Sequence, residues 1–278
     1  MFLHTLPRTL VIGCGAIGEE IVAALSALGA VGCIAAVLER SRNLARVEKL
    51  AAGRFPVVDR IDAALAARPA IALECAGHEA VAAFGASLLG RGIDLVVASG
   101  GCLADRRIAG ELAAASRQGG GRLLLPSGAV AGIDGLLAAR PGLERVTYRS
   151  AKPPLAWRGT PAERLIDLDA VTGASVFFDG SARDAALNYP KNANVGVTVA
   201  LAGIGLERTR VELVADPALS DPLGMIEAEG ALGRFRFETL AYAPNNPKTS
   251  RLTAHSLMLA LTAGWAFSPL ETLAADVG

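Results

Sequence analysis

The chain has 278 residues, of which 52% are hydrophobic, and its 27 basic and 27 acidic side chains give a net charge of zero. This length and composition can bury one large core or two modest ones, and they predict two domains. A chain without excess charge offers no electrostatic reason for binding a nucleic acid or an anionic membrane. The longest apolar stretches, residues 195–206 and 257–267, are too short to cross a bilayer. We therefore expect a soluble enzyme with neither nucleic acid nor membrane as a partner.

All four cysteines lie in the first half of the chain, without CxxC spacing or a neighbouring histidine cluster. Cysteines in this arrangement are typical of small buried side chains in a reducing compartment. Residues 1–8 also lack the basic-then-apolar pattern of a signal peptide. The sequence therefore predicts free thiols, a cytoplasmic protein and no metal site. The cysteines are Cys14, Cys33, Cys75 and Cys102.

Residues 9–29 form the first predicted strand-to-helix unit and contain a GxGxxG pattern. In dinucleotide-binding units the first glycine, here Gly13, permits the tight turn, and the second, Gly15, lets a pyrophosphate approach the backbone. The third, Gly18, allows close packing of helix on strand, and the free N–H groups at the helix start favour phosphates. We predict a site for NAD or NADP here, and a βαβ unit with coincidental glycines is the alternative. The predicted binding residues of this turn are Gly13, Gly15, Ala16, Ile17 and Gly18.

The second apolar run, residues 34–38, ends at Glu39, which stands 21 residues after Gly18. A carboxylate at this position accepts hydrogen bonds from the adenosine ribose in dinucleotide-binding units. The next residue, Arg40, could stack on adenine or neutralise a 2′-phosphate, and an exposed strand-end arginine is the alternative. We expect NAD to be preferred and NADP to remain usable.

Strand and helix patterns alternate as far as residue 125, and this alternation predicts a parallel sheet with right-handed crossovers. Ligands of such sheets bind at the carboxyl ends of the strands, so the segments after residues 74, 98 and 125 should face the cofactor. We therefore predict that Cys75, Ala76 and Gly77 contact it. Further strands are expected at 57–58, 70–74, 94–98 and 122–125, and helices at 42–53, 61–67, 80–90 and 105–118.

Beyond residue 126 the pattern becomes that of an α+β domain. We predict an α/β protein with an N-terminal Rossmann domain built on a parallel sheet and a C-terminal α+β domain. The first should cover residues 1–128, completed by the helical segment 246–278, and the second, for substrate binding and oligomerisation, residues 129–245. Strands are expected at 146–150, 175–178, 210–214, 225–229 and 233–240, and helices at 184–188, 194–206 and 250–266.

Six short sequence words follow one another in the second half of the chain. They are LPSGAVAGID at 125–134, KPP at 152–154, FDGSA at 178–182, PKNANV at 190–195, ADP at 215–217 and NPKTS at 246–250. In order and spacing they resemble the L-aspartate dehydrogenases, NAD(P)-dependent enzymes with a Rossmann domain and an α+β domain. The resemblance implies oxidation of aspartate to iminoaspartate, which hydrolyses to oxaloacetate and ammonia or enters NAD biosynthesis.

The same resemblance implies that Ala129 and Asn194 contact the nicotinamide end of the cofactor. A Ser-Gly-Ala turn permits close backbone approach, and an asparagine offers a donor and an acceptor to a carboxamide. An ordinary domain crossover is the alternative for the turn. For Asn194 the alternative is a helix N-cap.

The chain departs from the family pattern at Gly224, where the resemblance places a catalytic histidine. Glycine cannot move a proton, so another group does this work, water does it slowly, or activity or substrate has changed. Of the three histidines, His4 is close to the terminus and His255 lies in an apolar helix. His78, which follows a strand end, is the remaining catalytic candidate, with a packing role as the alternative.

A dicarboxylate substrate also requires cations and hydrogen-bond donors. We predict that Lys152, Lys191 and Ser127 bind the substrate, with Lys191 a second catalytic candidate beside His78. Surface solvation is the alternative for either lysine. The preferred function is NAD(P)-dependent oxidation of L-aspartate by a homodimer. The alternatives are a catalytically weakened NAD(P)-binding protein with a regulatory role, and a dehydrogenase or imine reductase for another amino acid.

Overall fold

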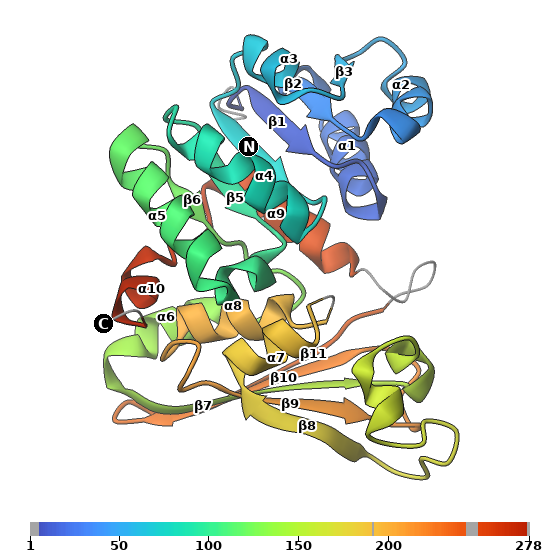
Figure 1. Cartoon of the computed structure of the whole chain (residues 1–278), viewed down its shortest axis with the longest axis vertical. Helices are drawn as coiled ribbons and strands as arrows, with labels where there is room; N and C mark the ends of the chain where they lie inside the picture. The colour runs from blue at the N-terminus through green and yellow to red at the C-terminus, as the bar shows by residue number, and fades with distance from the viewer. Residues whose placement is uncertain (1–5, 191, 243–249, 277–278) are drawn as a thin grey trace. The chain divides into compact units, whose positions relative to one another are not determined.

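The computed structural model describes residues 6–190, 192–242 and 250–276 (Figure 1). The chain divides into two compact units, each made of three segments. The first unit comprises Met1–Ser99, Arg107–Pro126 and Thr253–Ser268. The second comprises Gly100–Arg106, Ser127–Leu252 and Pro269–Gly278.

The first unit contains a six-stranded parallel sheet in the order β3-β2-β1-β4-β5-β6. Its central strands are short apolar runs with nearly every residue buried, as expected for a parallel sheet covered on both faces. The chain progresses outward from β1 in both directions, so the point where the strand order reverses lies between β1 and β4. The strands are β1 Thr9–Ile12, β2 Ile34–Leu38, β3 Val57–Val58, β4 Ile71–Glu74, β5 Asp94–Val97 and β6 Leu123–Leu124.

Helices flank this sheet and close its hydrophobic core (Figure 1). Val11 of β1, Ile21 of α1 and Val37 of β2 are fully buried there, and helix α9 adds Leu257. The predicted Rossmann arrangement is confirmed by this sheet and its helices. The elements are α1 Ala16–Ala27, η1 Val31–Cys33, η2 Ser41–Asn43, α2 Leu44–Ala51, α3 Ile61–Ala66, α4 His78–Leu89, α5 Arg106–Gly119 and α9 Arg251–Ala263.

The second unit contains a five-stranded mixed sheet in the order β11-β10-β7-β9-β8. Its central strand β7 runs parallel to β9, and the other pairs are antiparallel. Helices α6, α7 and α8 lie along one face of this sheet (Figure 1). The strands are β7 Leu143–Lys152, β8 Ser175–Ser181, β9 Arg210–Ala215, β10 Leu223–Gly230 and β11 Gly233–Leu240. The helical elements are η3 Gly100–Ala104, α6 Ile133–Ala139, η4 Arg140–Gly142, η5 Pro154–Trp157, η6 Pro161–Arg164, α7 Ala182–Asn188, α8 Asn194–Ala202 and α10 Leu270–Ala275.

The predicted α+β character of the second unit is confirmed, but several element boundaries differ from the prediction. Strand β7 extends to Lys152, so this lysine belongs to the sheet rather than to a loop. Helix α8 ends at Ala202 instead of residue 206, because Gly203 and Gly205 follow and Gly205 has φ +93°. The short helices α6 and α10 are absent from the sequence prediction, since seven and six residues are too few for a clear period.

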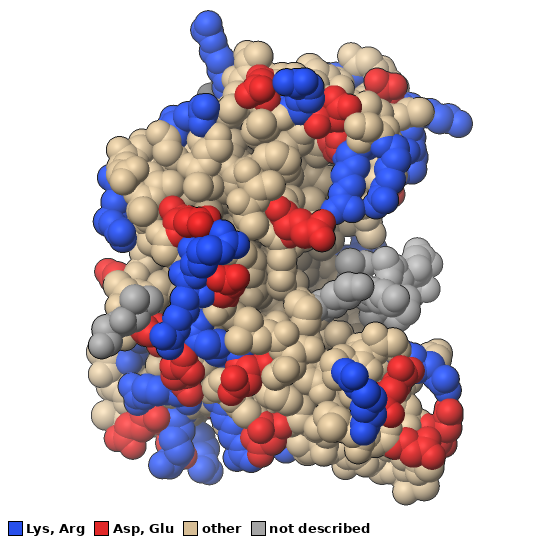
Figure 2. All heavy atoms as spheres, viewed as in Figure 1, with Lys and Arg blue, Asp and Glu red and all other residues tan. Residues whose placement is uncertain are grey.

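Acidic and basic side chains are interspersed on the face of the molecule drawn in Figure 2. A group of basic side chains over α2 is accompanied there by acidic ones. Within the ranges that the structure describes, no helix combines the length and the apolar character needed to span a lipid bilayer.

Candidate functional site

Three glycines with different surroundings shape the turn between β1 and α1. Gly13 has φ +86°, and a Cβ on it would lie 2.6 Å from the Cβ of Ala76. A Cβ on Gly18 would lie 2.4 Å from the carbonyl oxygen of Gly13. A Cβ on Gly15, in contrast, would meet no atom within 4 Å. The packing of the chain therefore requires Gly13 and Gly18, whereas the space beside Gly15 is open to a ligand.

A pocket of about 420 Å³ lies beside this turn, at the carboxyl ends of β1 and β2. Its volume is in the range of small-molecule sites. Of the residues predicted to bind the cofactor, the pocket is lined by Gly13, Gly15, Glu39, Arg40, Cys75 and Ala76. Four other residues of this unit that were predicted to bind the cofactor do not line the pocket: Ala16, Ile17, Gly18 and Gly77. The catalytic candidate His78 does not line it either.

The carboxylate of Glu39 holds the end of β2 against the glycine turn. Its Oε2 accepts a hydrogen bond from the amide of Cys14 at 2.7 Å, and its Oε1 accepts one from the amide of Arg40 at 2.8 Å. Partial burial acts to raise the pKa of Glu39, but hydrogen bonds from the Arg40 and Cys14 amides and from Asn43, together with the charge of Arg46, lower it below its usual value. Glu39 is therefore an anionic acceptor at the rim of the pocket, as ribose hydroxyls require.

Basic side chains surround Glu39, and only one of them was predicted as a site residue. Arg40 pairs with Glu79 at 3.0 Å, and both side chains are largely exposed. Arg46 pairs with Glu19 and donates to the carbonyl of Cys14. Arg42 and Arg46 both line the pocket, together with Asn43. The sequence predicted a helix over residues 42–53 but gave no signal that Arg42, Asn43 and Arg46 line a pocket.

Glu74, which was not predicted as a site residue, anchors the loop that carries Cys75 to Gly77. It is fully buried, and its Oε1 accepts hydrogen bonds from the amides of Ala76 at 2.8 Å and Gly77 at 2.7 Å. The amide and hydroxyl of Ser99 also donate to this carboxylate, each at 3.0 Å. Burial raises the pKa of Glu74, and the hydrogen bonds from Gly77 and Ser99 oppose that rise. The available signal was an acidic residue ending an otherwise apolar strand.

The second unit holds the other predicted site residues that the structure describes: Ser127, Ala129, Lys152 and Asn194. Ser127 and Ala129 are half-buried in the turn that precedes α6. Asn194 is the first residue of α8, and its Oδ1 accepts a hydrogen bond from the amide of Gly101 at 3.0 Å. Ala193 occupies the N-cap position of that helix. Lys191 lies outside the described residues.

Lys152 is a mostly buried amine at the end of β7. Its Nζ donates to the Oδ1 of Asn192 at 3.0 Å and lies 4.7 Å from the centre of the Trp157 ring. No carboxylate of the described residues pairs with it. Burial lowers the pKa of Lys152 to about 8, because the charged form loses hydration that no counter-ion replaces. A buried amine without a carboxylate is a functional-site signal.

Gly224 lies on the neighbouring strand β10, where it pairs with Ser150 of β7. A Cβ on Gly224 would lie 3.0 Å from Cγ1 of Val130 and 3.3 Å from the hydroxyl of Tyr148. Burial raises the pKa of Tyr148 to about 12, although a hydrogen bond with Ser150 opposes this. The Gly224 backbone is thus closely surrounded, and the nearby phenol remains protonated at working pH.

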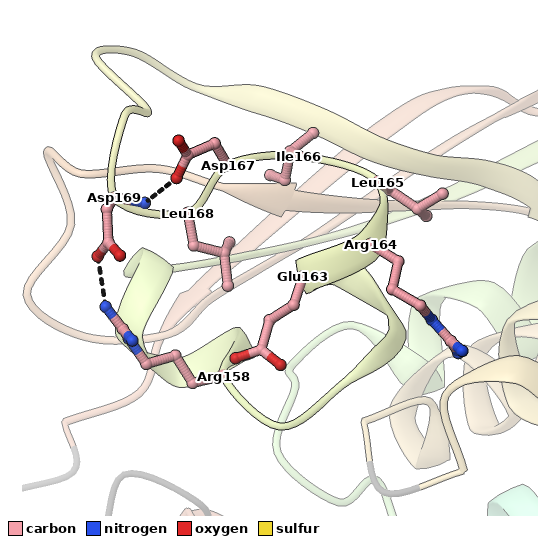
Figure 3. A pocket seen from close by; sticks show the side chains of 8 residues that line it. All are labelled: Arg158, Glu163, Arg164, Leu165, Ile166, Asp167, Leu168 and Asp169. Carbon is pink, nitrogen blue, oxygen red and sulfur yellow. Dashed lines mark hydrogen bonds and ion pairs between the residues drawn. The ribbon is translucent and has the colours of Figure 1, made fainter.

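A hollow of about 490 Å³ in the second unit lies around η6 and the loop after it (Figure 3). Two of its charged groups, Arg158 and Asp169, pair with one another, and the amide of Asp169 donates to Asp167 at 3.0 Å. Figure 3 shows Arg164 pointing away from Glu163, so the charges do not converge on one point. We assign no ligand to this hollow. Across the described ranges, no group of three His, Cys, Asp or Glu side chains could hold a metal ion.

We predict that Gly15→Val leaves the fold intact and removes dinucleotide binding. The backbone at Gly15 has φ −83°, and a side chain there meets only open space, where the pyrophosphate would lie. Losing two hydrogen bonds to a charged phosphate, about 1.5–3 kcal/mol each, lowers affinity by about 100-fold or more. Titration with NADH measures the affinity, and Gly13→Val, which clashes with Ala76, is the control that should lower the melting temperature. Wild-type NADH affinity in a folded Gly15→Val protein would refute the assignment.

We predict that Lys152→Met stabilises the protein at neutral pH. With a folded pKa of about 8 against an ordinary 10.5, burial of the ammonium costs up to about 3 kcal/mol below pH 8. Between pH 8 and 10.5 the unfolded chain holds the proton and the folded protein does not, so wild-type stability rises with pH and the gain from methionine shrinks.

Urea unfolding at pH 7 and pH 10 measures this difference. Lys49→Met, at an exposed position of α2, is the control and should change stability little at either pH. A gain at pH 7 that persists undiminished at pH 10 would contradict the charge explanation and point to packing alone.

Comparison with known proteins identifies the family. Residues 134–263 match the model of the aspartate dehydrogenase C-terminal domain, and residues 13–126 match that of the homoserine dehydrogenase NAD-binding domain. An L-aspartate dehydrogenase of Ralstonia nicotianae is 44% identical over 258 residues, covering 90% of this chain and 94% of that protein, and one of Ruegeria pomeroyi is 50% identical over 196 residues, covering 70% and 71%. The solved aspartate dehydrogenase of Thermotoga maritima shares the fold, with a TM-score of 0.71 at 24% identity over 93% of this chain and 97% of that one. The chain therefore belongs to the L-aspartate dehydrogenase family.

Proposed function

We propose that the protein oxidises L-aspartate to iminoaspartate, with NAD or NADP as hydride acceptor. Iminoaspartate then hydrolyses to oxaloacetate and ammonia. The observation that carries this proposal is the open space at Gly15, in a chain that belongs to the L-aspartate dehydrogenase family. The packing of the protein does not require a glycine at position 15, and a pyrophosphate bound against the backbone there explains the absence of a side chain.

The residues of the first unit fit the adenosine and pyrophosphate parts of the cofactor. The glycine turn would hold the pyrophosphate at the start of α1, and Glu39 would accept the ribose hydroxyls. The loop of Cys75 to Gly77, which Glu74 anchors, would contact the nicotinamide half of the cofactor. Ala129 and Asn194 would contact the nicotinamide end. When bound, the oxidised nicotinamide supplies the acceptor for a hydride.

We place the substrate against residues of the second unit. Ser127, Lys152 and Lys191 are proposed to contact the dicarboxylic amino acid. The mostly buried amine of Lys152, which lacks a carboxylate partner, supports this placement. Gly224 offers no side chain for proton transfer, and His78 and Lys191 are the catalytic groups proposed from the sequence.

The regulatory alternative is not favoured, because the relatives over most of the chain are named as enzymes. A dehydrogenase for another amino acid differs from the preferred proposal only in substrate. We further propose a cytoplasmic homodimer, for which the free cysteines and the edge strands β8 and β11 give support. Light scattering after size-exclusion chromatography would measure the oligomeric state.

Initial rates of NADH formation test the proposed function. The full chain is assayed with NAD⁺ or NADP⁺ and L-aspartate, with D-aspartate, L-glutamate and L-asparagine as comparison substrates. We expect turnover of L-aspartate above the others, and none in Gly15→Val. Tight NADH binding without turnover of any amino acid would favour a binding protein, and faster turnover of another amino acid would change the substrate.

We predict that Glu39→Ala narrows or reverses the preference for NAD over NADP. The carboxylate should repel a 2′-phosphate, whereas Arg40 and Arg42 beside it should attract one. Removing a repulsion of about 1.4 kcal/mol changes the ratio of kcat/KM for the two cofactors by about tenfold. Glu48→Ala, on the exposed side of α2, is the matched control. If the ratio is the same in Glu39→Ala and wild type, the ribose assignment is incorrect.

A further inference from the structure

The second unit carries no histidine. The three histidines of the chain, His4, His78 and His255, all fall outside its residue ranges. A reaction at an α-amino group needs a residue that gains and loses a proton near neutral pH. Among the residues of the second unit, against which we place the substrate, only another kind of side chain can meet that requirement.

Lys152 shares a face of the second sheet with the position of Gly224. Tyr148, Ser150 and Lys152 are alternate residues of β7, so their side chains point to the same face of the sheet. Tyr148 and Ser150 are buried, so this face is covered by other parts of the protein. Gly224 pairs directly with Ser150, so Lys152 is its diagonal neighbour. Diagonal neighbours in an antiparallel pair lie about 7–8 Å apart, which a four-carbon side chain can cover.

Neither of the two contacts of the Lys152 amine carries a charge. An amide oxygen such as Oδ1 of Asn192 accepts a hydrogen bond from an ammonium and from a neutral amine alike. The opposing residue on β9 is Ala215, and η5 presents the ring of Trp157. No charged group of the described residues shifts the pKa of Lys152, and burial alone lowers it to about 8. This value suits a general acid/base at working pH, whereas Tyr148, with a pKa of about 12, stays protonated.

We infer that Lys152 is the catalytic acid/base of the reaction proposed above, on which this inference rests. Its neutral amine accepts a proton from the substrate's α-ammonium group, leaving a neutral α-amine and a Lys152 ammonium. The lone pair of the α-amine forms the C=N bond as a hydride leaves Cα, for which a bound oxidised nicotinamide would supply the acceptor, and the substrate becomes an iminium ion. Water then adds to the iminium carbon, ammonium leaves to give oxaloacetate, and Lys152 releases its proton to solvent.

Lys152→Arg separates proton transfer from charge pairing. Arginine keeps the positive charge and the donors but does not lose its proton, so it can hold a carboxylate and cannot act as a base. We expect kcat for L-aspartate oxidation to fall by about 10²- to 10⁴-fold, with KM for aspartate within about threefold. NADH affinity and the circular dichroism spectrum should be unchanged, and Lys49→Arg is the matched control.

The pH dependence of kcat and the rescue of activity by an added amine are two measurements that would not change if Lys152 had only a structural role. In the unmodified chain kcat should rise with pH through one ionisation near 8 and then level, and Lys152→Arg should lack that ionisation. In Lys152→Ala, added methylamine should raise the rate in proportion to its free-base concentration. Tetramethylammonium, which has no proton to exchange, should not.

A Lys152→Arg protein that retains kcat within about threefold would overturn the inference, leaving Lys152 as a cation that binds substrate. Retention of the ionisation near pH 8 in that variant would also overturn it, as would its loss in His78→Gln instead. Failure of the unmodified chain to oxidise aspartate while NADH binds would overturn the proposed function, and this inference with it. The rate of the unmodified chain with aspartate therefore distinguishes failure of the proposed function from failure of the Lys152 inference.

Discussion

The close approach of α1 to the end of β1 is the contact on which the proposed cofactor site depends. Only because Gly18 lacks a Cβ can the helix pack against the carbonyl of Gly13 and begin directly at the strand end. Its free N–H groups then face the space beside Gly15. The amide of Cys14, in the same turn, binds Glu39 and so fixes the end of β2 to this point. One helix-to-strand contact thus positions the groups that we propose to bind the phosphates and the ribose.

The fully buried Glu74 and the mostly buried Lys152 both lose hydration, and their surroundings compensate that loss to different degrees. Glu74 accepts four hydrogen bonds from backbone and hydroxyl donors, so its burial is partly compensated and the loop of Ala76 and Gly77 is tied to its carboxylate. Lys152 has one amide oxygen and one aromatic ring, and burial of its charge is left largely uncompensated. A buried charge whose lost hydration is replaced by hydrogen bonds is typical of a structural role. A buried charge without such bonds is typical of a group that binds a ligand or exchanges a proton.

The first unit could be predicted in detail because its signals are local. A buried run, three glycines and an acidic strand end lie within residues 9–39, and spacing alone relates them. The role of Glu74 depends on Ser99, and the environment of Lys152 depends on Asn192, which is 40 residues away. The periodicity of apolar residues does not predict contacts between side chains that are so far apart in the sequence. For the same reason the sequence indicated a lysine in the KPP word but not its burial or its place on a strand.

The position of Trp157 gives the protein a built-in optical probe. The indole is fully buried, its Nε1 donates to the carbonyl of Val214 at 2.9 Å, and the Lys152 amine lies over its ring. A charge held over a fixed indole perturbs its electronic states, so gain or loss of the proton should shift the emission of Trp157. The chain has one other tryptophan, Trp265, which belongs to the first unit. With that residue replaced by phenylalanine, fluorescence would follow the charge state of one amine during a single turnover.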